Sequence, residues 1–231
     1  MNPDFPAFEE RISVTFNDKA LLKQAFVHRS YLNENKEFPL GHNERLEFLG
    51  DAVLELVITD YLYGKYPEKN EGELTALRSA LVNANTLHAV GSQLGINDFL
   101  LLSRGEAKDT GRARQYILAN TMESIIGAIY LDRGYDVAKK FIHDFITPHL
   151  DKVIEDESWI DAKSLFQEKA QEHTGITPLY KTIKEVGPDH DKHFTVGVYL
   201  KNDLIAQGEG DSKQDAEQKA ARNGLKSKDW E

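Results

Sequence analysis

Cysteine is missing from this chain of 231 residues, and its absence excludes disulfide bonds and metal sites built on thiolates. A reducing cytoplasm is compatible with that absence. The first residues are acidic and lack the basic, apolar pattern of an export signal, so we expect a cytoplasmic protein. The sequence also has no apolar run long enough to span a bilayer, and we therefore expect no membrane partner.

Basic residues are in the minority: 28 lysines and arginines face 38 aspartates and glutamates, which gives a formal net charge of −10. This balance argues at first against a polyanionic partner, so any phosphate contact has to come from local basic clusters. Acid gathered around a divalent metal would produce the same balance. A zinc pair of the type HExxH, a Walker glycine loop and a Gly-x-Ser-x-Gly elbow are also absent.

The stretch from His42 to Asp60 organises the chain. Apolar residues recur at helical spacing and occupy nearly every face, which predicts a buried helix. Acidic residues at spacings of three and four nevertheless share one face, namely Glu44, Glu47, Asp51 and Glu55. Buried carboxylates need partners or a metal, because an unpaired buried charge is costly. The alternative is a solvated acidic stripe on a half-exposed helix.

A second helix, expected over residues 116–134, is also apolar almost all round. Its polar interruptions, Asn120 and Glu123, are three residues apart and share a face. Two such helices can meet to form an oxygen-lined site, and Mg²⁺ and Mn²⁺ prefer oxygen ligands. A bound metal would activate water and steady the oxyanions of a phosphoryl transfer.

Other parts of the chain set the organisation. Residues 17–34 read as one helix with Asn17 as its N-cap candidate, in which His28 and Arg29 are more readily explained by packing and pairing than by function. Residues 151–160 are acidic and indicate a linker or a frayed helix end. The pattern then changes to helix, three antiparallel strands and helix, expected at residues 161–173, 179–186, 194–200, 204–209 and 213–227, with Asp211 or Ser212 capping the last helix.

The string HNERLEFLGDAVLELVI at residues 42–58 closely resembles the signature of the ribonuclease III family of double-stranded-RNA endonucleases. The resemblance extends to HRSY at 28–31, NEGELTALRSALV at 70–82 and ILANTMESIIGAIYLDRGY at 117–135. The C-terminal segments LFQEKAQ, YKTIKEVGPDHDKHFTVGVYL and GEGDSKQDAEQKAA resemble a double-stranded-RNA-binding domain. Together these segments cover most of the chain in the order of the bacterial enzymes.

The resemblance implies a multidomain protein: an all-α endonuclease domain at residues 5–150, a linker at 151–160, and a small α+β (α-β-β-β-α) RNA-binding domain at 161–230. It implies a homodimer whose subunits each supply one catalytic centre. Mg²⁺, for which Mn²⁺ can substitute, would activate the water that attacks the phosphodiester. The products would carry 5′-phosphate and 3′-hydroxyl ends with short 3′ overhangs, in the processing of ribosomal and messenger RNA.

Carried over residue by residue, the resemblance assigns the metal site to Glu47, Asp51, Asn120 and Glu123, with Asp51 and Glu123 catalytic. Glu44 matches an acidic position that looks structural or RNA-facing. Phe48 matches an aromatic residue that inserts into the partner subunit, although burial in the core of its own subunit would look identical from the sequence.

One departure from the family pattern is serious, because Asn120 stands where the family has aspartate. Asn presents a neutral carbonyl oxygen where Asp presents an anion. We therefore expect weakened Mg²⁺ binding and strongly reduced cleavage, with folding and RNA binding largely kept. Two alternatives stay open: a double-stranded-RNA-binding protein that does not cleave, and a helical dimerisation module with an attached RNA-binding domain.

The resemblance also predicts how the C-terminal domain contacts RNA. Duplex RNA is recognised by shape, through 2′-hydroxyls and phosphates. Gln167 and Gln171, one turn apart, match positions that face the minor groove, and His190 lies in the turn that the family inserts into the next minor groove. Lys213 adds charge to the positive end of the last helix. Gln214 stands where many members have a second lysine, which suggests a weaker hold on phosphate.

Overall fold

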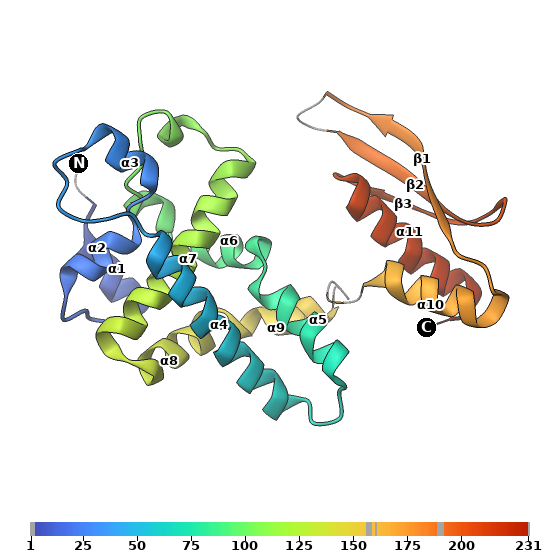
Figure 1. Ribbon diagram of the computed structural model, residues 1–231, viewed down its shortest axis with the longest axis horizontal. Helices are drawn as coiled ribbons and strands as arrows, with labels where there is room; N and C mark the ends of the chain where they lie inside the picture. Colours follow the sequence, from blue (N-terminus) through green and yellow to red (C-terminus); the bar gives the residue numbers. More distant parts are fainter. Residues whose placement is uncertain (1–2, 156–158, 160, 189–191, 231) are drawn as a thin grey trace. The chain divides into compact units, whose positions relative to one another are not determined.

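The computed structural model describes residues 3–155, 159, 161–188 and 192–230. The chain folds into two compact units, residues 1–159 and residues 160–231 (Figure 1). The predicted linker or frayed helix end begins as an ordered helix, because Leu150–Glu155 forms α9. No helix in the described part of the chain is both long and apolar enough to cross a membrane.

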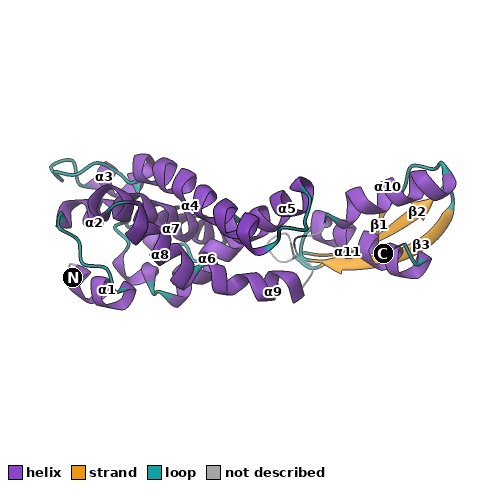
Figure 2. Cartoon of the chain, turned by 90° about the horizontal axis from the view of Figure 1, so that it is seen from below, coloured by secondary structure: helices purple, strands orange, loops and turns teal. Residues whose placement is uncertain are grey.

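Helices build the first unit, as Figure 2 shows in purple. In chain order the α-helices are α1 (Phe5–Ile12), α2 (Lys19–Ala25), α3 (Arg29–Glu34), α4 (Glu44–Lys65), α5 (Glu71–Val82), α6 (Ala84–Gln93), α7 (Arg112–Arg133), α8 (Tyr135–Phe145) and α9, and short 3₁₀ turns occur at Ile96–Phe99, Glu106–Lys108 and Thr147–His149. This arrangement confirms the predicted all-α domain.

The two longest helices, α4 and α7, lie side by side at the centre of this unit (Figures 1 and 2). Leu54 and Ile58 of α4 and Ile125 of α7 are completely buried in a shared apolar core. The expectation that α4 is buried on all sides is wrong for one face, because Phe48 is 80% exposed and Tyr63 is 75% exposed. Apolar composition alone does not distinguish a core face from an apolar surface.

The single helix predicted over residues 17–34 is in fact two helices, separated at residues 26–28. The Phe26 carbonyl accepts a hydrogen bond from the Leu101 N–H, and the His28 N–H donates to the Leu101 carbonyl. The Val27 carbonyl accepts from the Asn43 N–H. These backbone groups bond to distant segments, so they cannot continue a helix.

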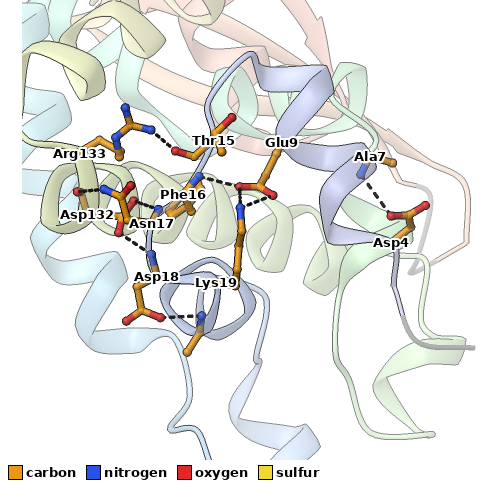
Figure 3. A network of polar contacts seen from close by, with 11 residues as sticks. Asp4, Ala7, Glu9, Thr15, Phe16, Asn17, Asp18, Lys19, Asp132 and Arg133 are labelled. Atoms are coloured by element: carbon orange, nitrogen blue, oxygen red, sulfur yellow. Dashed lines mark hydrogen bonds and ion pairs between the residues drawn. The ribbon is translucent and has the colours of Figure 1, made fainter.

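Polar contacts attach the segment between α1 and α2 to the end of α7 (Figure 3). The Asp132 carboxylate accepts from the Asn17 N–H at 2.7 Å and from the Asp18 N–H at 2.8 Å. Asp18, rather than the predicted Asn17, is the N-cap of α2 and accepts from the Ala20 N–H. The Asn17 side chain is engaged elsewhere, because its amide donates to the Asp132 backbone carbonyl at 3.5 Å. The network fixes the C-terminal end of α7.

The second unit combines α10 (Ala162–Thr174), β1 (Leu179–Val186), β2 (His193–Leu200), β3 (Asp203–Gly210) and α11 (Lys213–Lys228). The strands form an antiparallel sheet in the order β1-β2-β3, and both helices belong to its core. The helices begin at side-chain caps, since Asp161 accepts from the Ser164 N–H and Ser212 from the Asp215 N–H. This order confirms the predicted α-β-β-β-α fold.

Candidate active site between helices α4 and α7

Two glycines allow α4 and α7 to approach until their backbones touch. A Cβ atom added at Gly50 would collide with the backbone carbonyl oxygen of Glu123, and one added at Gly127 would collide with that of Leu46. Any larger residue at either position would push the helices apart. The backbone of Glu123 lies at this contact, and its carboxyl group is close enough to feel the charges of Asp51 and Glu47 on α4.

The contact brings together all four residues predicted to form the metal site. Glu47 and Asp51 lie one turn apart on α4, and Asn120 and Glu123 lie one turn apart on α7. Asp51 is exposed, whereas the other three side chains are partly buried. The site is therefore a row of oxygen-bearing side chains at the edge of the helix pair, open to solvent on one side.

Burial and repulsion between like charges dominate the electrostatics of this row. Burial, then the charge of Asp51 and then that of Glu47 raise the pKa of Glu123 to about 8. Burial raises the pKa of Glu47, as do the charges of Glu44 and Asp51, while a hydrogen bond from the Asn120 side chain acts in the opposite direction. The amide of Asn120 thus stabilises the ionised form of Glu47.

Among the described residues, no basic side chain neutralises this row. Within residues 3–155 and the other described ranges, no lysine, arginine or histidine forms an ion pair with Glu47, Asp51 or Glu123. Among the same described residues, no three Asp, Glu, His or Cys side chains are close enough together to hold a metal ion as they stand. The side chains supply oxygen ligands at the contact between the two helices, but their oxygens do not converge on a single metal position.

A pocket of about 310 Å³ opens beside Glu47 and Asn120. His28 and Arg29, from the junction between α2 and α3, line it together with Tyr116 of α7. This lining places histidine and arginine side chains next to the acidic row, and the pairing expected for Arg29 is present, with Glu44 at 3.8 Å.

Asn43 holds the start of α4 and went unnoticed in the sequence. It is only 3% exposed. Its side-chain amide donates to the Ala25 carbonyl at 3.1 Å, and its own carbonyl accepts from the Leu46 N–H at 2.8 Å. Its position just before the acidic helix is a signal that could have identified it as an anchor.

The glycines at the helix contact were missed for a different reason: their role depends on a partner helix more than 70 residues away.

The residues predicted to contact RNA lie in the second unit. Gln167 and Gln171 are exposed on α10, one turn apart. Lys213 is exposed at the first position of α11, directly after the cap, and Gln214 is exposed beside it. His190 lies outside the described residues.

Comparisons with known proteins agree with this architecture. A family model described as Ribonuclease-III-like matches residues 18–150, and one described as Double-stranded RNA binding motif matches residues 162–228. A curated relative named Ribonuclease 3, from Enterococcus faecalis, is 44% identical over 219 residues, which is 95% of this chain and 95% of the relative. The chain belongs to the ribonuclease III family.

Other members of the ribonuclease III family give the same result. Ribonuclease 3 of Protochlamydia amoebophila is 44% identical over 222 residues, covering 95% of this chain and 90% of the relative. A solved structure of the nuclease domain of ribonuclease III from Campylobacter jejuni superposes with a TM-score of 0.58 at 38% identity, over 63% of this chain and 97% of that one. The work on that structure concerns structural flexibility in the region of its nuclease domain that is involved in dimer formation.

Proposed function

We propose that this member of the ribonuclease III family is a metal-dependent endoribonuclease for double-stranded RNA, attenuated by Asn120. The observation that carries the proposal is the contact between α4 and α7, which gathers Glu47, Asp51 and Glu123 without a basic partner in the described residues. The match of residues 162–228 to a double-stranded-RNA-binding motif supports the choice of substrate.

The donor chemistry of the row fits a hard divalent cation such as Mg²⁺, for which Mn²⁺ can substitute. Carboxylate and amide oxygens are the ligands these ions prefer. Burial raises the pKa of Glu123 most, and the repulsion from Asp51 and Glu47 that adds to it is the kind a cation relieves. When bound, such an ion supplies a nucleophilic water and stabilises phosphoryl oxygens. Glu47, Asp51 and Glu123 would hold it, and Asn120 would contribute a neutral oxygen.

The side chains themselves would have separate tasks. Asp51 is exposed and would meet the substrate first, whereas Glu123 is partly buried and a bound cation would favour its ionised form. We assign both to catalysis, with products carrying 5′-phosphate and 3′-hydroxyl ends. Asn120 would orient Glu47 through its amide hydrogen bond, but it adds no charge. The expected result is weaker cation binding and slower cleavage.

We further propose that Gln167, Gln171 and Lys213 contact duplex RNA, with His190 in the neighbouring minor groove. Amide side chains both donate and accept hydrogen bonds, which suits the 2′-hydroxyls of the minor groove. Lys213 lies where the N-terminus of α11 already favours a phosphate.

A homodimer completes the proposal. Phe48 is 80% exposed on α4, and an aromatic ring in that setting favours a protein partner. The description of the Campylobacter jejuni structure refers to dimer formation, which is consistent with such an interface.

The decisive experiment compares this chain with its Asn120→Asp variant. Both are incubated with a long RNA duplex in Mg²⁺ and in Mn²⁺, and binding is measured on the same samples. If the variant cleaves at least about 100-fold faster than the parent while both bind the duplex equally, the result supports attenuation by Asn120. If neither chain cuts while both bind and dimerise, the protein is a double-stranded-RNA-binding protein that does not cleave.

A further inference from the structure

His28 is fixed at the break between α2 and α3. Its N–H donates to the Leu101 carbonyl at 3.1 Å, so its backbone is held by a distant segment. Its side chain is the N-cap of α3, since Nδ1 accepts from the Ser30 N–H at 3.3 Å. One nitrogen of the imidazole, Nδ1, is therefore occupied in capping α3.

Hydrogen bonds around Ser30 determine which nitrogen of His28 carries the proton. The Ser103 N–H donates to Ser30 Oγ at 3.1 Å, which leaves the hydroxyl proton free for another acceptor. His28 Nδ1 lies 2.8 Å from Ser30 Oγ. Nδ1 thus accepts from both the hydroxyl and the backbone N–H of Ser30, so it is unprotonated in the neutral ring. The proton of the neutral ring is on Nε2.

Nε2–H of His28 is a hydrogen-bond donor at the edge of the candidate active site. In the described part of the chain no group hydrogen-bonds to Nε2, and it is not enclosed by protein atoms. His28 lines the pocket that Glu47 and Asn120 also line. Burial lowers the pKa of His28, which keeps the ring neutral near pH 7 and preserves this arrangement of donor and acceptor.

We propose that His28 and Arg29 form a subsite for a backbone phosphate of the RNA, adjacent to the acidic row. This inference rests on the proposed function. Nε2–H of His28 donates to a non-bridging phosphate oxygen, and the Arg29 guanidinium, which lines the same pocket, supplies positive charge. His28 is a binding and positioning residue in this role, since it takes no part in proton transfer.

Two carboxylates, Glu44 and Glu47, line the pocket, so a phosphate enters it only where the Arg29 guanidinium and the proposed cation of the acidic row offset their charge. Glu44 would repel a phosphate, but it lies 3.8 Å from the Arg29 guanidinium and 3.7 Å from the His42 ring. The Arg29 side chain is 73% exposed, so its contact with Glu44 is loose and the guanidinium can turn toward an incoming phosphate. A phosphate placed there would lie next to Glu47 and Asn120, which line the same pocket and belong to the acidic row.

Two substitutions separate a phosphate contact from simple capping of α3. His28→Asn keeps a good N-cap acceptor for the Ser30 N–H but is too short to present a donor in the pocket. His28→Gln places an amide N–H near the position of Nε2 but caps the helix poorly. His88→Asn, on α6 and outside the pocket lining, is the matched control for the change of side chain.

The test measures the affinity of the full chain for an RNA duplex in Mg²⁺ over a series of salt concentrations, with RNA integrity checked afterwards. We expect His28→Asn to weaken binding about tenfold without changing the salt slope, because a neutral donor releases no counterions. His28→Gln should stay within about threefold of the parent, and Arg29→Gln should reduce the salt slope by about one. His88→Asn should bind like the parent.

Several results would overturn the subsite. Parent-like binding by His28→Asn, or an equal loss in His28→Gln and His28→Asn, would leave capping as the only role of His28. If His28→Asn does not fold in a thermal unfolding assay, Arg29→Gln decides, and an unchanged salt slope overturns the subsite. A parent chain that binds no duplex RNA would instead overturn the proposed function itself.

Discussion

Among the described carboxylates, Glu123 is the one whose charge the fold opposes most strongly. Its pKa of about 8 compares with an ordinary value of 4.5, because burial and the charges of Asp51 and Glu47 all favour the protonated form. Between these two values the folded chain retains a proton that the unfolded chain has released. The free energy of unfolding therefore falls as the pH rises through this window.

Replacing Glu123 with glutamine removes that dependence. In EDTA, we expect the free energy of unfolding of the parent to fall, relative to Glu123→Gln, by up to about 1.4 kcal/mol per pH unit between about pH 5 and pH 8. Urea unfolding at several pH values measures this difference. Parallel pH profiles for the two chains would contradict the raised pKa, and added Mg²⁺ should flatten the slope of the parent.

Single residues were predictable from the sequence where spacing alone decides their position. Helical spacing was enough to place Glu47 with Asp51 on one face and Asn120 with Glu123 on another. The raised pKa of Glu123 was not predictable, because it depends on burial and on charges from the other helix. Asn43 was missed because the carbonyl to which its side chain donates belongs to Ala25, 18 residues earlier in the chain.

The contact between α4 and α7 depends on the absence of side chains at two positions. We expect Gly50→Ala to lower the free energy of unfolding by about 2–3 kcal/mol, because the new methyl group meets the Glu123 backbone and separates the helices. Gly64→Ala on the same helix is the control: no atom lies within 4 Å of the added Cβ, and the change should be neutral or stabilising by up to about 1 kcal/mol. Urea unfolding measures both, and equal effects would contradict the close contact.

Helix boundaries show what periodicity can and cannot predict. The long helices α4 and α7 were expected because their apolar pattern continues over many turns. The division of residues 17–34 into α2 and α3 was not expected, because the local pattern is helical throughout. Backbone hydrogen bonds to Leu101 and Asn43 override it, and no local sequence signal encodes partners that distant.

Helices α10 and α11 are expected to contact RNA by two different kinds of interaction. Gln167→Ala and Gln171→Ala should each weaken duplex binding about three- to tenfold and leave the salt slope unchanged, because amides displace no counterions. Lys213→Ala should reduce the salt slope by about one, whereas Lys228→Ala at the opposite end of α11 should not. Binding titrations at several salt concentrations distinguish these outcomes. A change of slope in either glutamine variant would argue against the groove assignment.

At the scale of the whole molecule, α4 carries an apolar face that the fold of one chain leaves exposed. Phe48, Leu56 and Tyr63 lie on this helix with more than half of each side chain exposed. Exposed aromatic and aliphatic side chains grouped on one helix favour an interface between proteins. Phe48 also directly follows Glu47, so a second chain that covers it would lie beside the acidic row.

Phe48→Ala should raise the dissociation constant of the proposed homodimer by at least about tenfold, because a buried aromatic residue is a frequent hot spot of an interface. The same change should alter the stability of the isolated chain by less than about 0.5 kcal/mol, since the ring makes few contacts within its own subunit. Leu131→Ala, at a residue of α7 that is 53% exposed, is the control and should leave the dimer unchanged. Sedimentation equilibrium at several concentrations measures the dissociation constant. Equal dissociation constants for the parent and Phe48→Ala would place the interface elsewhere, and the two acidic rows would then need another arrangement to reach both strands of one duplex.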